Sequence, residues 1–228
     1  KIEKNSFGQY LREFPLLPDG EEVHLFDGSL KYNQGVHSAI LDIDVGNRDL
    51  QQCADAIMRL RAEYLFENKR YKEIAFNFTN GWKFEYQKWR EGSKLKVKGN
   101  KSSWVNGGDK KETYKDFRNY LDQIFMYAGT LSLAKELKAK SLKDIKIGDV
   151  IIKGGSPWHA VIVVDMCVNS DNGDKAVMLA QSYMPAQQIH ILKNQNSLEY
   201  SPWYLVSQIK DKIVTPEWTF DRDQVKSF

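Results

Sequence analysis

Two hydrophobic periods alternate along this chain, one close to that of an α-helix and one of two residues. In residues 50–67, apolar side chains recur every three or four positions, which predicts a helix with one largely apolar face. Residues 114–138 repeat that spacing and predict a second long helix. Within it, Gly129-Thr130 predicts a break or bend before the last turns.

Alternation of apolar and polar side chains predicts strands elsewhere in the chain. Residues 39–45 form one such segment, with clean alternation from Leu41 onward, and residues 74–86 predict a hairpin around Thr79-Asn80-Gly81. Residues 142–166 combine a short entry strand, a glycine-rich turn and a long apolar strand that opens with His159. A turn over residues 169–174 then leads to a partner strand over residues 175–182.

Two further segments carry turn signals. Residues 5–31 contain proline and Asp-Gly pairs, which predict a short helix followed by a hairpin of short strands. Residues 91–111 are rich in Gly, Ser, Asn and Lys, so we expect a long loop that lies as a lid beside a groove. Trp104, alone among polar neighbours there, either lines a ligand site or pins the loop to the body.

Composition bounds the class of protein. The 228 residues are 42% hydrophobic and 28% charged, which is ordinary for a globular domain. We expect one domain over residues 1–228, with residues 69–113 as an insertion made of a hairpin and a long loop. A net charge of +3 with scattered basic residues gives no reason to expect a nucleic-acid partner. No apolar run approaches the length of a membrane span.

The two cysteines, Cys53 and Cys167, could form one disulfide or none. Cys53 lies near the start of the predicted helix, where Asp49 and Gln52 have the spacing of a capping box. A buried cysteine often acts as a small hydrophobic residue. Near a helix N-terminus, however, the positive end of the dipole lowers a thiol pKa and favours a nucleophilic thiolate. Both interpretations stand at this point.

The residues before His159 carry a resemblance. Asp144, Gly148 and Asp149 lie in the phrase LKDIKIGDV, which resembles the D-x-x-x-G-D entry of the NlpC and CHAP superfamily of papain-like cysteine peptidases and amidases. In that superfamily the next strand opens with the catalytic histidine. The resemblance therefore implies a papain-like α+β fold, in which an antiparallel sheet packs against an N-terminal helix that bears the nucleophilic cysteine. Additional helices and the inserted hairpin would complete it.

A cysteine nucleophile needs a base, and the base is usually oriented by a third polar group. The resemblance implies the order Cys53, His159 and a polar residue on the following strand. We expect Gln181 as this third residue, its amide oxygen holding the Nδ1 proton, if a long or bulged turn sets the register. A one-residue shift would present Ser182 instead.

Distance along the strand excludes other partners for His159. Cys167 follows it by eight residues, roughly 27 Å if extended, and Asp165 by six, roughly 20 Å. The chain also differs from the NlpC pattern, since Gln52-Cys53-Ala54 replaces Asp-Cys-Ser, and Cys53 is expected about one turn into the helix.

Three phrases, QQCADA, GGSPWHA and LAQSYMP, resemble more closely a bacterial family known only as a domain of unknown function. Members of that family commonly resemble exported lipoproteins. The resemblance therefore implies an extracytoplasmic location, in the periplasm or at the cell surface. Contact with a membrane would then come only through a lipid anchor that has been removed from this sequence.

Two functional hypotheses follow. The first is a thiol hydrolase that cleaves an amide or peptide bond, with cell-wall peptides implied as substrates and no cofactor or metal. Gln51 or Gln52 would help to stabilise the oxyanion. The second is a catalytically inactive binding or scaffold module on the same fold. A third, weaker interpretation places a metal between Asp42, Asp44 and His37, whereas the remaining histidines are expected to be structural.

Overall fold

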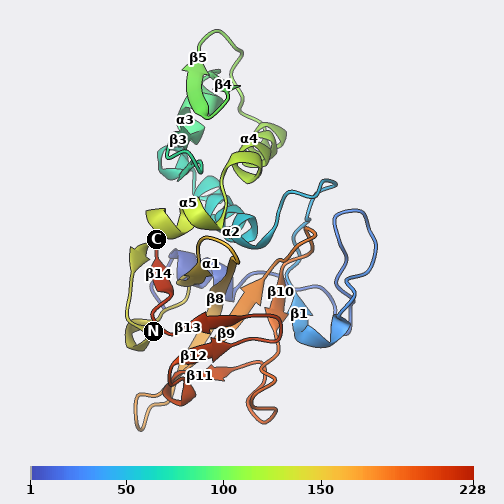
Figure 1. The fold of residues 1–228 in the computed structure, drawn as a ribbon, viewed down its shortest axis with the longest axis vertical. Helices are drawn as coiled ribbons and strands as arrows, with labels where there is room; N and C mark the ends of the chain where they lie inside the picture. Colours follow the sequence, from blue (N-terminus) through green and yellow to red (C-terminus); the bar gives the residue numbers. More distant parts are fainter. Residues whose placement is uncertain (1) are drawn as a thin grey trace.

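The computed structural model describes residues 2–228, which form a large antiparallel sheet with most helices gathered at one end of the molecule (Figure 1). The helices are α1 (Phe7–Arg12), α2 (Cys53–Glu67), α3 (Tyr86–Arg90), α4 (Tyr114–Tyr127) and α5 (Thr130–Glu136). The strands are β1 (His37–Ile40), β2 (Ala75–Asn77), β3 (Lys83–Glu85), β4 (Lys94–Lys98), β5 (Lys101–Val105), β6 (Lys138–Ala139), β7 (Val150–Lys153), β8 (His159–Val168), β9 (Lys175–Gln181), β10 (His190–Leu192), β11 (Tyr204–Leu205), β12 (Lys212–Val214), β13 (Thr219–Asp221) and β14 (Val225–Ser227). The expectation of a mixed α and β fold with antiparallel pairing is confirmed.

The main sheet has eight strands in the order β1-β10-β9-β8-β7-β14-β6, with β11 paired to β9. Three separate two-stranded sheets pair β12 with β13, β2 with β3, and β4 with β5. The long strand β8 therefore lies at the centre of the main sheet, between β7 and β9. His159 is the first residue of β8 and therefore lies at one end of the central strand of the sheet.

Strand β8 is apolar at consecutive positions because both faces of the sheet are covered. Ala160, Ile162 and Val164 belong to the core cluster that includes α2. Val161 and Val163 point the other way and pack in a cluster with Ile213 of β12 and Phe220 of β13. Side chains alternate across a strand, so His159 falls on the face covered by β12 and β13.

The break predicted at Gly129-Thr130 is confirmed, since α4 ends at Tyr127 and α5 begins at Thr130. Thr113 caps α4, because its hydroxyl oxygen accepts the Asp116 backbone N–H at 3.1 Å and Asp116 in turn accepts the Thr113 N–H. The break between α4 and α5 turns the chain beside the start of α2, where both segments line one groove.

The loop expected over residues 91–111 contains the hairpin of β4 and β5, so that expectation is wrong for residues 94–105. The hairpin lies at the end of the molecule farthest from β11 and β12 (Figure 1). Trp104 pins it to the body, because its ring stacks on Phe84 at 4.9 Å between centroids. Lys94 and Lys96 of β4 alternate along the strand and are exposed. These polar residues made the segment resemble a loop in the sequence.

The first strand also departs from its predicted position. It covers His37–Ile40, so it shares only Ala39 and Ile40 with the strand predicted over residues 39–45. Beyond Leu41 the chain leaves the sheet, and Asp44 instead pairs with Arg59 at 3.1 Å and Arg118 at 3.3 Å. Within residues 2–228, no helix combines the length and apolar composition that crossing a bilayer would require.

Candidate active site

Cys53 is the first residue of α2, not one turn inside it as expected. The cap differs from the predicted one, because the Gln52 backbone N–H donates to Oδ2 of Asp55 at 3.1 Å. The predicted partner Gln52 instead donates its side-chain amide to Asp49, also at 3.1 Å. The helix thus begins three residues later than predicted, and Cys53 lies among the free backbone N–H groups of its first turn.

The Cys53 thiol is 4% exposed. Burial and the nearby Asp55 carboxyl raise its pKa to about 12, although the backbone N–H groups of Ala54 and Ala160 favour the thiolate. Ala160 directly follows His159 in β8. The sulfur therefore lies beside the first residues of β8, and the thiol is uncharged at neutral pH.

His159 packs among aromatic rings at the first residue of β8. Its ring centroid lies 4.7 Å from that of Tyr183, 5.3 Å from that of Trp218 and 5.9 Å from that of Phe220. The side chain is 2% exposed. Burial lowers its pKa to about 4, against the opposing effect of the hydrogen bond to the Gln181 oxygen, and Lys31 lowers it further. The imidazole is therefore neutral at physiological pH.

Gln181, the last residue of β9, contacts His159 directly. Its Oε1 lies 2.7 Å from Nε2 of the ring. A turn over residues 169–174 and a bulge between Val163 and Asp165 set the register that pairs Ile162 with Ala180. Continued along the strands, this register makes His159 and Gln181 diagonal neighbours on one face. The contact uses Nε2, so the expectation that Gln181 holds Nδ1 is wrong and Nδ1 is left for another partner.

Ser182, the alternative third residue, points to the other face of the sheet. Its hydroxyl donates to the backbone oxygens of Gln51 at 3.0 Å and Gln187 at 2.8 Å. It thereby ties the segment before α2 to the segment after β9. Of the two candidates, only Gln181 lies against His159.

Glu217 and Lys31 extend the chain of polar contacts from Gln181. Nε2 of Gln181 donates to Oε2 of Glu217 at 2.7 Å, and Oε1 of Glu217 lies 2.8 Å from Nζ of Lys31. Sequence reasoning missed Glu217 and Lys31, because each stands in a segment that looks like an ordinary surface turn. A charged residue next to Trp218, in an otherwise aromatic segment, was the one available signal.

A groove of about 470 Å³ opens onto Cys53. Its walls come from the start of α2, the α4–α5 break and the β7–β8 loop, and they combine apolar side chains with hydroxyl and amide groups. The lining residues are Gln52, Cys53, Ala54, Asp55, Thr79, Phe125, Ala128, Gly129, Thr130, Leu131, Gly155, Ser156 and Trp158. No lysine, arginine or histidine is among them, although Trp158, the residue before His159, is.

A family model for a domain of unknown function, DUF4846, matches residues 1–227. The chain belongs to the DUF4846 family. The expectation of a family defined only as a domain of unknown function is therefore confirmed. Neither the curated proteins nor the solved structures contain a match to this DUF4846 chain.

Of the other residues considered for the site in the DUF4846 chain, only Gln52 lines the groove at Cys53. Both cysteines are free, and Cys167 is exposed on β8. Asp165 pairs with Arg12 at 2.5 Å. Gln51 is buried, and its side-chain oxygen accepts from Arg59 at 2.9 Å, whereas Gln52 reaches the groove. Gln52 is therefore the better placed of the two to meet a ligand.

His37, Asp42 and Asp44 do not come together as a metal site. Within the described residues 2–228, no group of three or more His, Cys, Asp or Glu side chains could hold a metal ion. Nε2 of His37 instead lies 3.0 Å from the backbone oxygen of Glu21.

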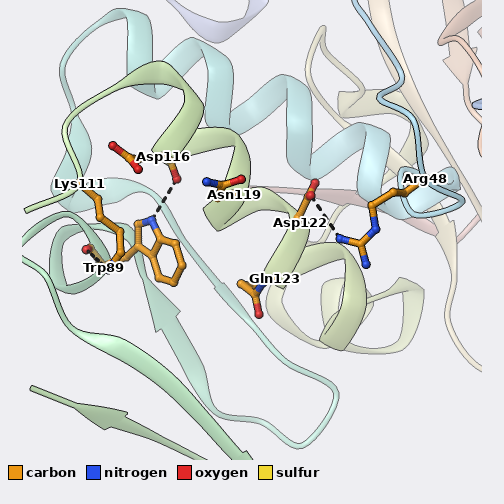
Figure 2. A pocket seen from close by; sticks show the side chains of 7 residues that line it. All are labelled: Arg48, Trp89, Lys111, Asp116, Asn119, Asp122 and Gln123. Atoms are coloured by element: carbon orange, nitrogen blue, oxygen red, sulfur yellow. Dashed lines mark hydrogen bonds and ion pairs between the residues drawn. The ribbon is translucent and has the colours of Figure 1, made fainter. Parts of the chain in front are cut away.

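A second depression of about 370 Å³ lies on the helical side of the DUF4846 chain (Figure 2). It is lined by Arg48, Trp89, Lys111, Asp116, Asn119, Asp122 and Gln123. Most of its polar groups already have partners, since Trp89 donates its indole N–H to the Asp116 backbone oxygen at 3.0 Å and Arg48 pairs with Asp122 at 3.5 Å. It contains neither a nucleophile nor a histidine.

Proposed function

We propose that this DUF4846 chain is a thiol hydrolase that cleaves an amide or peptide bond at Cys53. The observation that carries the proposal is the 2.7 Å contact between His159 Nε2 and Gln181 Oε1. Cys53, the first residue of α2, lies against the backbone of Ala160, the residue after His159. A nucleophile, a base and a group that orients the base make up a cysteine hydrolase. The groove at Cys53 would receive the scissile bond.

In this mechanism the Cys53 thiol gives its proton to Nδ1 of His159 while the sulfur bonds to the carbonyl carbon. The C–N bond then breaks, and the leaving amine takes the proton from His159. Water releases the acyl group from sulfur, with His159 again accepting and returning the proton. The Cys53 backbone N–H and the Gln52 side chain would stabilise the oxyanion.

The charge state of the pair decides when the proton moves. Burial raises the pKa of Cys53 to about 12 and lowers that of His159 to about 4, so the resting pair is thiol and neutral imidazole. A neutral imidazole with a free Nδ1 can act as a base at once. The proton would therefore transfer during attack, not before substrate binds.

The papain-like fold is part of the same proposal. It is supported by a cysteine-bearing helix packed on an antiparallel sheet, and by the chain order Cys53, His159, Gln181. Cell-wall peptides as substrates and an extracytoplasmic lipoprotein location remain proposals from the resemblance. The groove, which lacks basic side chains, suits an uncharged or apolar segment of such a peptide.

The test compares cysteine variants of the full chain. Fluorogenic peptides and isolated cell-wall peptides would be incubated with the C167A variant, so that the exposed cysteine cannot react. We expect hydrolysis, acylation of Cys53 by a thiol-reactive substrate analogue, and loss of both in C53A/C167A. Full hydrolysis in C53A/C167A would overturn the mechanism.

A second candidate is a binding module on the same fold. The burial of Cys53 and His159, 4% and 2% exposed, favours it. Such a module would bind peptides in the groove with the same affinity in C167A and C53A/C167A, and neither protein would turn them over. Isothermal titration calorimetry together with the hydrolysis assay separates the two functions.

A further inference from the structure

The amide of Gln181 has a fixed direction in this structure, and Glu217 sets it. Oε2 of Glu217 lies 2.7 Å from the amide nitrogen, and the other carboxyl oxygen is held by Lys31. An ionised carboxylate only accepts hydrogen bonds. If the amide were reversed, its oxygen would face the Glu217 carboxylate, so the NH₂ group must point toward Glu217.

His190 supports the same direction. Its Nδ1 lies 2.9 Å from the backbone oxygen of Gln188, a pure acceptor, so this nitrogen carries the proton. Burial lowers the pKa of His190 to about 3, and the ring is neutral. Its Nε2 is therefore an acceptor, and it lies 3.4 Å from the amide nitrogen of Gln181. Both acceptors are on the NH₂ side of the amide.

The fixed direction of the Gln181 amide allows only one neutral tautomer of His159. Gln181 presents Oε1, an acceptor, to Nε2 of His159, so this ring nitrogen must be the donor. In a neutral imidazole the other nitrogen then has the free lone pair. Nδ1 is consequently the basic atom, as the proposed attack by Cys53 requires.

We infer that Glu217 is a positioning residue, which selects the Nε2-protonated tautomer of His159 by fixing the amide of Gln181. What this tautomer does in catalysis rests on the proposed function, whereas the tautomer itself does not. Lys31 makes the carboxylate necessary, because it occupies one acceptor oxygen while Gln181 needs the other. Lys31 is 6% exposed and the Glu217 side chain 15%, so water competes little for either group.

The substitution Glu217→Gln reverses the arrangement. A glutamine has a single acceptor oxygen, and the charged Lys31 takes it because hydrogen bonds to charged groups are stronger. The new NH₂ group then faces Gln181, whose amide turns its oxygen toward it, because the contact with residue 217 at 2.7 Å outweighs the longer contact with His190 at 3.4 Å. Gln181 in turn presents NH₂ to Nε2 of His159, which must accept. The proton of His159 therefore moves to Nδ1.

The tautomer can be read without a substrate. Two-bond proton–nitrogen NMR correlations of the imidazole ring distinguish the two neutral forms at pH 7. We expect the Nε2-protonated form in the wild type, the Nδ1-protonated form in E217Q, and the wild-type form again in K31M/E217Q, where the glutamine oxygen is free for Gln181. An unchanged Nε2-protonated His159 in E217Q would overturn the inference.

A further variant keeps the test decisive if E217Q does not fold. K31M/E217M replaces both charges with apolar side chains of similar length, and only His190 is then left to orient the amide. The contact with His190, at 3.4 Å, is too long to hold the amide by itself, so we expect both tautomers in this variant. A single Nε2-protonated form would contradict the role of Glu217. If wild-type hydrolysis is found, E217Q should lower kcat at least tenfold with KM unchanged. A tautomer switch in a chain without hydrolysis would support the inference while removing the proposed function.

Discussion

His159 and Gln181, separated by 22 positions in the sequence, meet in a contact of 2.7 Å between Nε2 and Oε1. The contact is diagonal across β8 and β9, and it depends on the bulge between Val163 and Asp165. Without that bulge the register would move by one residue and present the opposite face of β9. One irregularity in the middle of the sheet thus determines which residue meets the histidine.

Replacing Gln181 with Leu should leave the buried Nε2–H of His159 without an acceptor. We expect a loss of about 1–3 kcal/mol in the free energy of unfolding, because an unpaired buried donor keeps its desolvation cost. Any hydrolytic activity should fall by about 10²-fold as the base loses its orientation. Urea unfolding and peptide hydrolysis measure the two effects.

Ser182→Ala is the matched control for this substitution, because Ser182 is the next residue and its hydroxyl bonds away from His159. It should reduce stability while leaving kcat close to that of the wild type. Equal losses of kcat in the two variants would show that Gln181 acts only through stability.

Asp55 raises the pKa of Cys53 after the larger effect of burial. Asp55→Asn removes the acidic group and keeps a side-chain oxygen to accept the Gln52 N–H that caps α2. In a C167A background, we expect the rate of Cys53 alkylation by iodoacetamide at pH 8 to rise several-fold, because loss of the carboxyl lowers the pKa of the thiol. An unchanged rate, with the melting temperature retained, would mean that the carboxyl has no influence on the thiol.

The buried histidines should make the protein less stable in mild acid. Burial lowers the pKa of His190 to about 3, whereas the unfolded chain has the ordinary value of about 6.5. As the pH falls below 6.5, His190 binds a proton in the unfolded state but stays neutral in the folded state, so the free energy of unfolding falls. Between pH 6.5 and 5 this one residue should cost about 2 kcal/mol.

The variant His190→Gln isolates this contribution from those of other groups. The difference in the free energy of unfolding between wild type and H190Q, followed by urea titration at several pH values, should shift by that amount in favour of H190Q as the pH falls to 5. A difference that stays constant with pH would contradict a neutral, buried His190.

Trp104 should anchor the β4–β5 hairpin. Its ring stacks on Phe84 and lies 5.2 Å from that of Trp82, so Trp104→Ala should destabilise the hairpin by about 2 kcal/mol. Hydrogen exchange in residues 94–105 should accelerate far more than exchange in β8. Val105→Ala, at a position 42% exposed on the same strand, should leave exchange in both regions unchanged.

Local patterns were sufficient for several elements of this fold. The helix after Cys53, the break at Gly129 and the β8–β9 pair follow from spacing and turn residues that lie close together in the chain. The hairpin of β4 and β5 could not be predicted in that way. Its exposed face carries lysines, and the anchoring role of Trp104 depends on its stacking with Phe84 of β3, a contact that the sequence pattern does not show.

The residues of the candidate site likewise fall into those that local sequence patterns reveal and those that they do not. Cys53, His159 and Gln181 each stand at the end of a regular element, where sequence patterns reveal them. Glu217 and Lys31 do not stand at the end of a regular element, so no sequence pattern reveals them. They come together through the tertiary fold, across a separation of 186 positions, and no local period extends that far.

The C-terminal segment that places Glu217, Trp218 and Phe220 over His159 also has a consequence for how the protein is made. During synthesis Cys53 and His159 are added well before Glu217, since chains are made from the N-terminus. Until then His159 has neither its aromatic cover nor a settled amide partner. A nascent chain would thus carry Cys53 and His159 in an unfinished site, so any activity would begin only after the segment of Glu217, Trp218 and Phe220 has folded over His159.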